Sequence, residues 1–592
     1  MKIQLINEPN LQISPIKQVL LNRGLNAAEI SHYLNLTEKD VYSFLLLGEE
    51  KLKEGAQVLL QTIQNNDTAI VIVDCDCDGY TSAALLINYL YFIFPTWIKN
   101  NLKWIMHDGK AHGLNEHLNL LLNEDYKLII TPDGGSNDYL AHKKLKEQGK
   151  NILVLDHHPA DKISEDAIVI NNQLSDYPNK NLSGVGVTWQ FCRYIDSLME
   201  TEYANSLIDL VALGLCGDMM SLKSFETRYL ITKGFQINNI HNPFIDYMIE
   251  KNNFPLNKPD YKSNLSEQAC TNIGAAFFIV PFVNAVTRSG TLEEKNLIFK
   301  AMLSHRAFDR IPEIKRNKLT GKEEILVLQA VRIIGNIKNR QTRAEEKSLK
   351  VLNEIIEKNN MLKEKILLFL LQPNEIDSNI RGLVANKLAI KYTRPCLILT
   401  YNKDTDTYDG SMRGYTKNGL KNFKNLLRTC PGVVYVQGHP NASGVSIKKE
   451  KIDKFLSTIN LLMRYVPTTP IYEVDYFFDF PSQKNGEIIM DIAQMNDYWG
   501  QDIDRAYVGI KFKVTQTNFS IMKSNTLKIT LNNNLTLIKF NGTQEDIDNF
   551  TTDGWVEVEA YCKCNRNEWN DRVYAQLIIE DYEIIDSCAY LF

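Results

Sequence analysis

With 592 residues, 44% of them hydrophobic, and a formal net charge of −5 at pH 7, the chain is too long for one ordinary domain and has the composition of a folded globular protein. It contains no apolar run of membrane-spanning length, and its polar start lacks the apolar core of a signal peptide, so we expect a cytoplasmic protein with no membrane partner. The acidic net charge excludes binding of nucleic acid through global charge, so any such binding must come from local clusters of Lys and Arg.

The N-terminal half of the chain is predicted to contain a helical segment and then an α/β region. Residues 1–65 read as short helices, at 14–23, 26–34 and 49–64. Residues 66–305 alternate short apolar strands with helices, which is typical of a parallel sheet with crossover helices. Its predicted strands are 69–73, 128–131 and 152–155.

The C-terminal half is predicted to hold three further parts. Residues 306–372 are charged and helical, and we expect them to connect two lobes. A second α/β pattern occupies 373–467, with a helix at 383–392 and strands at 395–400 and 432–436. In 468–592, alternating strands such as 507–515, 526–531 and 555–562 predict a small β-barrel.

Carboxylates follow each predicted strand of the first α/β region, and another follows an apolar helix. Parallel strands place their carboxyl ends at one edge of the sheet, so these groups should converge. They are Asp74, Asp76 and Asp78 after the first strand, Asp133 after the second, Asp156 with His157 and His158 after the third, and Asp218 after the helix at 207–215.

The carboxylates of such a group would repel one another unless cations were bound between them. A set of carboxylate and imidazole ligands suits Mn²⁺, Mg²⁺ or Fe²⁺. One Asp after a strand is usually a helix cap or a turn residue. Four such sites, including a D-x-D-x-D-G and a D-H-H, instead favour a centre that holds two divalent cations and hydrolyses its substrate.

These segments resemble the motifs of the DHH phosphoesterases in order and spacing: DCDCDGYTS, TPDGG, LDHHPA and GLCGDMMSL. The resemblance implies that two cations, Mn²⁺ in preference to Mg²⁺, are ligated by Asp76, Asp78, Asp133, His157 and Asp218, with Asp133 as the bridge. It also implies that Asp74 and Asp156 orient the ligands from outside. The catalytic residues that it implies are Asp74, Asp133, His158 and Arg288, with His158 beside the scissile phosphate.

Nearly the whole chain resembles the RecJ-type exonucleases of this family, which degrade single-stranded DNA from the 5′ end. PFVNAVTRSGT resembles the RecJ segment that reaches the scissile phosphate, here through Asn284 and Arg288. GSMRGY and QGHPNASGVSI resemble the DHH-associated domain, so that Ser411, Arg413 and His439 would face the nucleic acid. The implied fold is a parallel-sheet DHH domain joined by a long helix to the DHH-associated α/β domain, followed by an OB-type barrel.

Two parts of the sequence bear on how DNA would be held. His107 stands where RecJ proteins offer an arginine to the terminal 5′ phosphate, and Lys110 is near it, so we expect both to contact DNA, while the need for a 5′ phosphate stays open. Residues 506–544 contain five lysines and neither Asp nor Glu, which suits an OB fold that binds single strands. The alternative is a solvated lysine face over a phenylalanine core. The predicted contacts are Lys511, Lys513, Phe519, Lys523 and Lys528.

The function implied is a single-stranded-DNA-specific 5′→3′ exonuclease that uses two metal ions in DNA repair or recombination. We expect a monomer whose partner is single-stranded DNA, with a single-strand-binding protein or a helicase as further partners. The first alternative is a DHH phosphodiesterase acting on short oligoribonucleotides or cyclic dinucleotides, whose chains are usually shorter. A non-catalytic scaffold is the second, but such relatives lose metal ligands and every ligand position is filled here.

Overall fold

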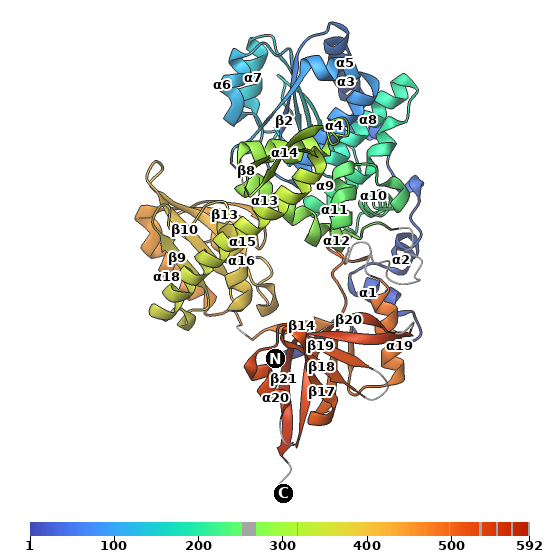
Figure 1. The fold of residues 1–592 in the computed structure, drawn as a ribbon. Helices are drawn as coiled ribbons and strands as arrows, with labels where there is room; N and C mark the ends of the chain where they lie inside the picture. The colour runs from blue at the N-terminus through green and yellow to red at the C-terminus, as the bar shows by residue number, and fades with distance from the viewer. Residues whose placement is uncertain are drawn as a thin grey trace. The chain divides into compact units, whose positions relative to one another are not determined.

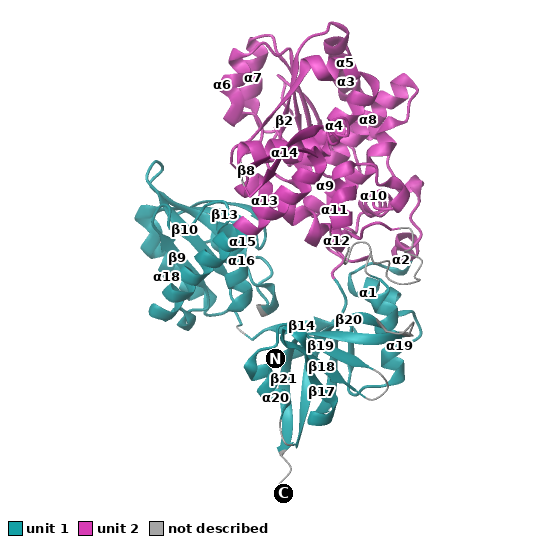
Figure 2. Cartoon of the chain, in the orientation of Figure 1, with its two compact units in different colours: residues 1–27, 341–495, 505–592 teal, residues 28–340, 496–504 magenta. Residues whose placement is uncertain are grey.

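The computed structural model describes residues 1–109, 111–251, 268–316, 318–467, 469–495, 498–531, 535–551, 554–569 and 572–589. The chain forms two compact units (Figure 2): unit 1 comprises Met1–Ala27, Gln341–Met495 and Arg505–Phe592, and unit 2 comprises Ala28–Arg340 and Asn496–Asp504. In the described ranges, none of the helices has the length and apolar character that a bilayer crossing requires.

The centre of unit 2 is a five-stranded sheet in the order β3-β2-β4-β5-β6. Every neighbouring pair in it is parallel, as the alternation of strands and helices predicted. All five residues of β2 and of β4 are buried, because helices cover both faces. The strands are β2 (Ala69–Val73), β3 (Leu102–Met106), β4 (Leu128–Pro132), β5 (Asn151–Asp156) and β6 (Ile168–Asn171).

The helices of unit 2 lie on both sides of this sheet, with α6 and α7 on one side and α3 and α8 on the other (Figure 1). Gly55 on α3 brings that helix close to the sheet, since a Cβ there would lie 3.0 Å from Leu153 of β5 and 3.3 Å from Phe191 of α8. The helices are α2 (Ala27–Tyr33), α3 (Glu49–Gln64), α4 (Cys77–Ile93), α5 (Pro95–Asn101), α6 (Leu118–Asn123), α7 (Tyr139–Glu147), α8 (Gly184–Met199), α9 (Ile208–Gly217), α10 (Phe225–Gly234), α11 (Pro243–Lys251), α12 (Asn272–Phe278), α13 (Val280–Ser289) and α14 (Leu292–Met302).

The segment 306–372 is not helical throughout, contrary to the sequence prediction. It begins with an antiparallel hairpin of β7 (Arg310–Lys315) and β8 (Lys318–Ile325). The 33-residue helix α15 (Leu326–Lys358) follows. Strand β9 (Leu367–Leu371) then pairs with β10 (Cys396–Asn402) of the next sheet. Charged residues on the hairpin resemble a solvated helix face when the sequence is read alone, which explains the error.

The second α/β region, in unit 1, has a mixed sheet in the order β12-β13-β11-β10-β9. Strands β9 and β10 are parallel there, and the other neighbours are antiparallel. Helices α15 and α16 pack on β9 and β10 from one side, whereas α17 and α18 cover the other face. The elements are α16 (Arg381–Lys391), β10 (Cys396–Asn402), β11 (Thr407–Arg413), α17 (Phe423–Arg428), β12 (Val433–His439), β13 (Ala442–Lys448) and α18 (Ile452–Met463).

The C-terminal part of unit 1 is a seven-stranded sheet in the order β15-β16-β20-β21-β19-β18-β17. In the described residues the two end strands do not pair, so the closed OB-type barrel stays a prediction and a β-rich sheet is what the structure shows. The elements are β14 (Ile471–Val474), β15 (Tyr476–Phe478), α19 (Gln483–Ala493), β16 (Tyr507–Thr515), β17 (Phe519–Met522), β18 (Thr526–Thr530), β19 (Thr536–Lys539), α20 (Gln544–Phe550), β20 (Gly554–Trp569) and β21 (Arg572–Ala589).

The N-terminal segment is divided between the units and is not purely helical. Strand β1 (Lys2–Leu5), which the sequence did not predict, pairs in parallel with β14. After α1 (Pro15–Asn22), Arg23 forms an ion pair with Asp475, whose carboxylate lies 2.8 and 2.9 Å from its guanidinium nitrogens. Residues 1–27 therefore belong to the same unit as the C-terminal sheet and contact it.

Candidate metal centre

Three neighbouring strands of the parallel sheet end beside one another and each leads into an ionisable side chain. Strand β2 ends at Val73, before Asp74, and β4 ends at Pro132, before Asp133. Strand β5 ends at Asp156, which precedes His157. Because the three strands run in the same direction, these groups gather at one edge of the sheet.

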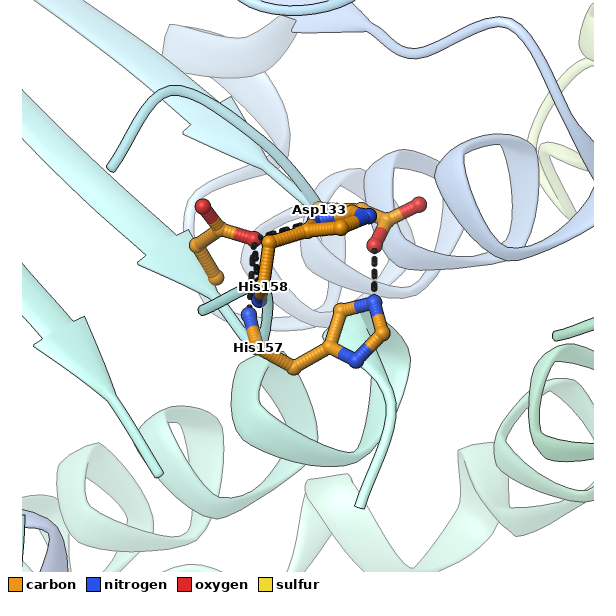
Figure 3. A group of neighbouring side chains, drawn as sticks. Asp133, His157 and His158 are labelled. Atoms are coloured by element: carbon orange, nitrogen blue, oxygen red, sulfur yellow. Dashed lines mark hydrogen bonds and ion pairs between the residues drawn. The ribbon is translucent and has the colours of Figure 1, made fainter. Parts of the chain in front are cut away.

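Four of the five predicted metal ligands come together around the imidazole of His157, itself one of the four. Its Nε2 lies 3.2 Å from Asp133 Oδ1, 3.4 Å from Asp218 Oδ2 and 3.9 Å from Asp78 Oδ2. Figure 3 shows the ring of His157 pointing at the Asp133 carboxylate. The structure thus brings together side chains that are far apart in sequence, since 140 positions separate Asp78 from Asp218.

Asp133 is held in an unusual backbone conformation at the end of β4. Its φ of 66° lies in the left-handed region, and its N–H donates to the carbonyl of Leu155, 2.8 Å away. Gly184 at the start of α8 approaches so closely that a Cβ there would lie 2.3 Å from Asp133 Oδ1. A side chain at position 184 would therefore displace the carboxylate.

Asp78 is fixed by the N-terminus of α8, an interaction that the sequence reading missed. Its carboxylate accepts hydrogen bonds from Ser183 Oγ at 2.9 Å, Gly184 N at 2.7 Å and Val185 N at 3.2 Å. Free N–H groups at a helix start favour an anion there. The Ser183-Gly184-Val185 tripeptide at the start of this helix was the signal available in the sequence.

Asp76 and Asp218 complete the acidic group. Asp76 is the N-cap of α4, where its side chain accepts from Gly79 N at 3.0 Å. Asp218 follows the last residue of α9, and its N–H donates to Gly214 O at 2.9 Å. Gly214 allows α9 to pack tightly, since a Cβ there would lie 2.5 Å from Asp78 Oδ1.

The electrostatics of this group are those of several buried acids in one place. Burial, and then the charge of Asp76, raises the pKa of Asp78 to about 6. Burial and the charges of Asp78 and Asp76 raise the pKa of Asp218 to about 8 and that of Asp133 well above its usual range. Burial and the neighbouring His158 lower the pKa of His157 to about 4, so its imidazole is neutral at pH 7 and able to ligate.

Divalent cations fit this donor set. Asp133 Oδ1 and His157 Nε2 are both buried and have no hydrogen-bond partner among the described residues. An unpartnered buried polar atom costs about 1–3 kcal/mol. Ions coordinated by these oxygen and nitrogen atoms would satisfy both, and they would also offset the repulsion that raises the carboxyl pKa values.

Asp156 lies beside His157 and His158 and hydrogen-bonds to both, whereas its predicted role in orienting the metal ligands stays a prediction. Its Oδ1 is 2.8 Å from His158 Nδ1 and accepts from the N–H of His157 at 2.7 Å. Burial disfavours both the Asp156 carboxylate and the His158 imidazolium, but the hydrogen bond and the charge attraction between them outweigh it. The pKa of Asp156 therefore falls below its usual range, and the pKa of His158 rises to about 9. His158 is therefore protonated at pH 7, with its side chain 46% exposed.

Asp74 lies among histidines and not among the ligands. Its Oδ2 is 2.7 Å from Nδ1 of His112, a residue that the sequence reading did not single out. The expectation that His107 contacts DNA is corrected by its position, because its side chain is 0% exposed and its Nδ1 is 2.6 Å from Glu116 Oε2. Lys110 lies outside the described residues.

Asn284 and Arg288, predicted to reach the scissile phosphate, are one turn apart on α13. Asn284 Oδ1 accepts from Cys77 N at 3.1 Å, which ties α13 to the loop that carries Asp76 and Asp78. This contact places the helix beside the candidate metal centre. Arg288 is partly exposed on the same side of α13.

Ser411, Arg413 and His439 lie in unit 1, on one face of the mixed sheet. Across β11, β13 and β12, Arg413 and His439 both lie opposite Ala442, while Ser411 lies opposite Gly444 in the neighbouring row. The opposite face, which includes Met412, packs against α17 and α18. The Arg413 guanidinium packs against α16, since a Cβ on Gly382 would lie 2.5 Å from its Nη2.

The predicted contacts of the C-terminal sheet are partly engaged within it. Lys511 Nζ lies 3.7 Å from Glu559 Oε2, and Lys513 Nζ lies 3.9 Å from the centre of the Trp555 ring. Phe519 packs against Phe550. These contacts favour the solvated-face alternative for those three positions. Lys523, which is exposed, and Lys528, which is half-buried, stay predictions as DNA contacts.

Comparisons with known proteins agree with this architecture. Residues 68–215 match the DHH family, N-terminal domain, and residues 363–464 match the DHHA1 domain. The chain is 29% identical over 594 residues to YorK of Bacillus subtilis strain 168, a prophage-derived protein provisionally named a single-strand DNA-specific exonuclease, covering 99% of this chain and 98% of that protein. It is 24% identical over 600 residues to the single-stranded-DNA-specific exonuclease RecJ of the same organism, covering 98% of this chain and 69% of RecJ.

Solved structures share the fold. RecJ from Thermus thermophilus, in complex with Mn²⁺, superposes with a TM-score of 0.69 and 16% identity, over 99% of this chain and 80% of that one. The same protein in complex with Mg²⁺ gives a TM-score of 0.62 at 14% identity, over 100% and 79% of the two chains. The predicted order of a parallel-sheet α/β domain, a long helix, a second α/β domain and a C-terminal β-rich part is thereby confirmed.

Proposed function

Because residues 68–215 and 363–464 match the DHH and DHHA1 domain models and the chain resembles RecJ-type exonucleases in sequence and fold, we propose that it is a metal-dependent exonuclease of the DHH family, specific for single-stranded DNA. One observation carries the proposal. Asp78, Asp133 and Asp218 meet around His157 at the edge of a parallel sheet, and two of the facing atoms lack a hydrogen-bond partner among the described residues.

In the proposed enzyme, two divalent cations are held by the set Asp76, Asp78, Asp133, His157 and Asp218. Bound there, the ions would supply activation of water and neutralisation of charge on the phosphate. Mn²⁺ or Mg²⁺ is the proposed cofactor, which the carboxylate-rich donor set supports. The chain itself contributes the framework: the N-terminus of α8 holds Asp78, and the left-handed turn after β4 holds Asp133.

His158 and Arg288 are proposed to bind the scissile phosphate. Asp156 keeps His158 protonated and oriented through Nδ1, so the partly exposed ring presents a positive charge to the substrate. Asn284 fixes α13 to the metal-binding loop, and Arg288 lies one turn further along that helix. A guanidinium is suited to phosphate oxygens because its N–H groups form a planar fork.

We extend the proposal to 5′→3′ polarity and to a role in DNA repair or recombination, both of which rest on the motif resemblance. Degradation of long single strands is further supported by the presence of the second α/β domain and the C-terminal sheet in one chain with the metal centre. Cyclic dinucleotides and short oligoribonucleotides are the alternative substrates, and a direct comparison of hydrolysis rates separates them from DNA.

The test uses the full chain and a single-stranded DNA of about 60 nucleotides, which is well beyond the site size of one binding domain. The DNA is labelled at its 5′ or its 3′ end and is prepared with and without a 5′ phosphate. Each reaction is run in Mn²⁺, in Mg²⁺ and in EDTA. We expect the 5′ label to be released first as a mononucleotide, only when a divalent ion is present, and the matching duplex to be degraded far more slowly. Faster hydrolysis of a cyclic dinucleotide or a short oligoribonucleotide than of the DNA would contradict the proposed substrate. Initial release of the 3′ label would contradict the proposed polarity.

A further inference from the structure

Two histidines and a glutamate meet near, but outside, the proposed ligand set. His107 follows the last residue of β3, and Glu116 and His117 belong to a 3-10 turn, η3 (Asn115–His117). Nδ1 of His107 lies 2.6 Å from Glu116 Oε2, and the two imidazole rings are 4.7 Å apart at 31°. One ligand atom from each of the three residues lies within 4.8 Å of the other two.

A hydrogen bond between His107 and Glu116 does not account for the whole cluster. Nε2 of His117 is buried and has no hydrogen-bond partner among the described residues. Burial, with the charge of His107, holds the pKa of His117 below its usual range, so its imidazole is neutral. A neutral imidazole is the form that binds a metal ion. Glu116, whose side chain is 31% exposed, leaves an entry path from solvent.

The backbone that carries the three side chains is held by contacts outside the cluster. Lys295 Nζ donates to the carbonyl of His107 at 2.9 Å and also to that of Asp108. Asp138 accepts from Leu114 N and from Asn115 Nδ2, both at 2.7 Å, at the start of η3. Both segments are thus positioned without an ion, which lowers the entropy that ligation would cost.

We propose that His107, Glu116 and His117 form a separate site for one divalent transition-metal ion of the Zn²⁺ class. Two imidazoles and one carboxylate are a set that binds Zn²⁺ and leaves a position for water. The proposed catalytic group has one imidazole among four carboxylates, and such oxygen-rich ligands suit Mn²⁺ and Mg²⁺. The two sites should therefore differ in metal preference, and the second one does not depend on the proposed nuclease activity.

The test measures bound metal and not activity. The full chain carrying Asp133→Asn and Asp218→Asn, which weaken the catalytic group, is freed of metal, dialysed against buffered Zn²⁺ and assayed by mass spectrometry for zinc per chain. When His117→Ala is added to this double variant, the zinc content should fall by about one equivalent per chain. Adding His241→Ala, which removes an exposed histidine of the same unit outside the cluster, should remove none. Co²⁺ in place of Zn²⁺ should give visible absorption that is lost only with His117→Ala.

Equal zinc content in the His117→Ala and His241→Ala proteins would overturn the proposal, and so would a double-variant parent that binds no zinc. Far-UV circular dichroism checks that each protein is folded. If His117→Ala does not fold, Glu116→Gln replaces it, because the amide keeps the shape of the side chain and removes the charged ligand. The same loss of one equivalent is expected, and its absence would be equally decisive.

Discussion

The two five-stranded sheets of this chain place their polar side chains in different ways. In unit 2 the strands are all parallel, so Asp74, Asp133 and His157 follow the ends of three strands at one edge. In unit 1 each neighbouring pair among strands β10 to β13 is antiparallel. Ser411 and His439 there lie within strands, on one face of the sheet. A parallel sheet concentrates charge at an edge, whereas an antiparallel one distributes polar groups over a surface.

The difference extends to how polar groups are satisfied. At the edge in unit 2, Asp133 Oδ1 and His157 Nε2 are buried without hydrogen-bond partners among the described residues. On the sheet of unit 1, Asp409 has three side-chain partners, which include Ser446 Oγ at 2.6 Å and Thr407 Oγ1 at 2.8 Å. Bound ions would satisfy the first arrangement, whereas Asp409 is satisfied by side chains of its own sheet. We therefore expect the edge to carry the chemistry and the face to carry binding.

The largest effect should follow a change at the edge. Asp133→Asn keeps the shape of the side chain, and Asn tolerates the positive φ at this position. Hydrolysis of single-stranded DNA should fall about a thousandfold or more, equivalent to about 4 kcal/mol, because a proposed shared ligand is lost. Initial rates in Mn²⁺ measure it, with the exposed Asp176→Asn as the control. A rate within about tenfold of the parent, or about 1.4 kcal/mol, would show that the edge is not the catalytic centre.

The next effect concerns the metal-free protein. The folded-state pKa values of Asp78, about 6, and Asp218, about 8, lie above the ordinary 3.8, so these two groups bind more protons in the folded state than in the unfolded state between about pH 4 and pH 8. Without metal, stability should therefore fall as the pH rises through this range. A divalent ion present at about a hundred times its Kd should add about 2.7 kcal/mol to the free energy of unfolding. This gain should be larger at about pH 8 than at about pH 5.

Thermal unfolding in EDTA and in Mn²⁺, at these two pH values, measures this prediction. Asp218→Asn removes one of the two raised carboxyl groups, so the fall of Tm with pH in EDTA should become smaller in that variant. An EDTA-treated protein whose Tm does not decrease between these pH values, or a variant with an unchanged slope, would contradict the linkage.

The smallest effect should follow a change on the face. Arg413→Ala removes a guanidinium from the row that includes His439, and single-stranded DNA should bind roughly tenfold more weakly, a loss of about 1.4 kcal/mol. Fluorescence anisotropy in the Asp133→Asn background measures affinity without cleavage. Arg464→Ala, an exposed arginine after α18, is the control and should bind as the parent does. If Arg413→Ala and Arg464→Ala bind single-stranded DNA with equal affinity, the sheet face that carries Arg413 is not part of the binding surface.

Much of the candidate metal centre was predictable because its signals are local. Strand β2 was predicted at its observed bounds, and β4 and β5 within one residue at each end, because short apolar runs with β-branched residues indicate buried parallel strands. The convergence of Asp78, Asp133, His157 and Asp218 then followed from the parallel order, together with the motif resemblance.

What the sequence by itself determined is therefore which side chains lie at the end of each strand and that a parallel sheet collects them. Only the tertiary structure decided which distant groups hold them. Ser183 anchors Asp78 across 105 residues, His107 is buried against Glu116, and β1 pairs with β14. Local periodicity reports the burial of a residue but not the identity of a partner far along the chain, because long-range pairs form only when packing brings their elements together.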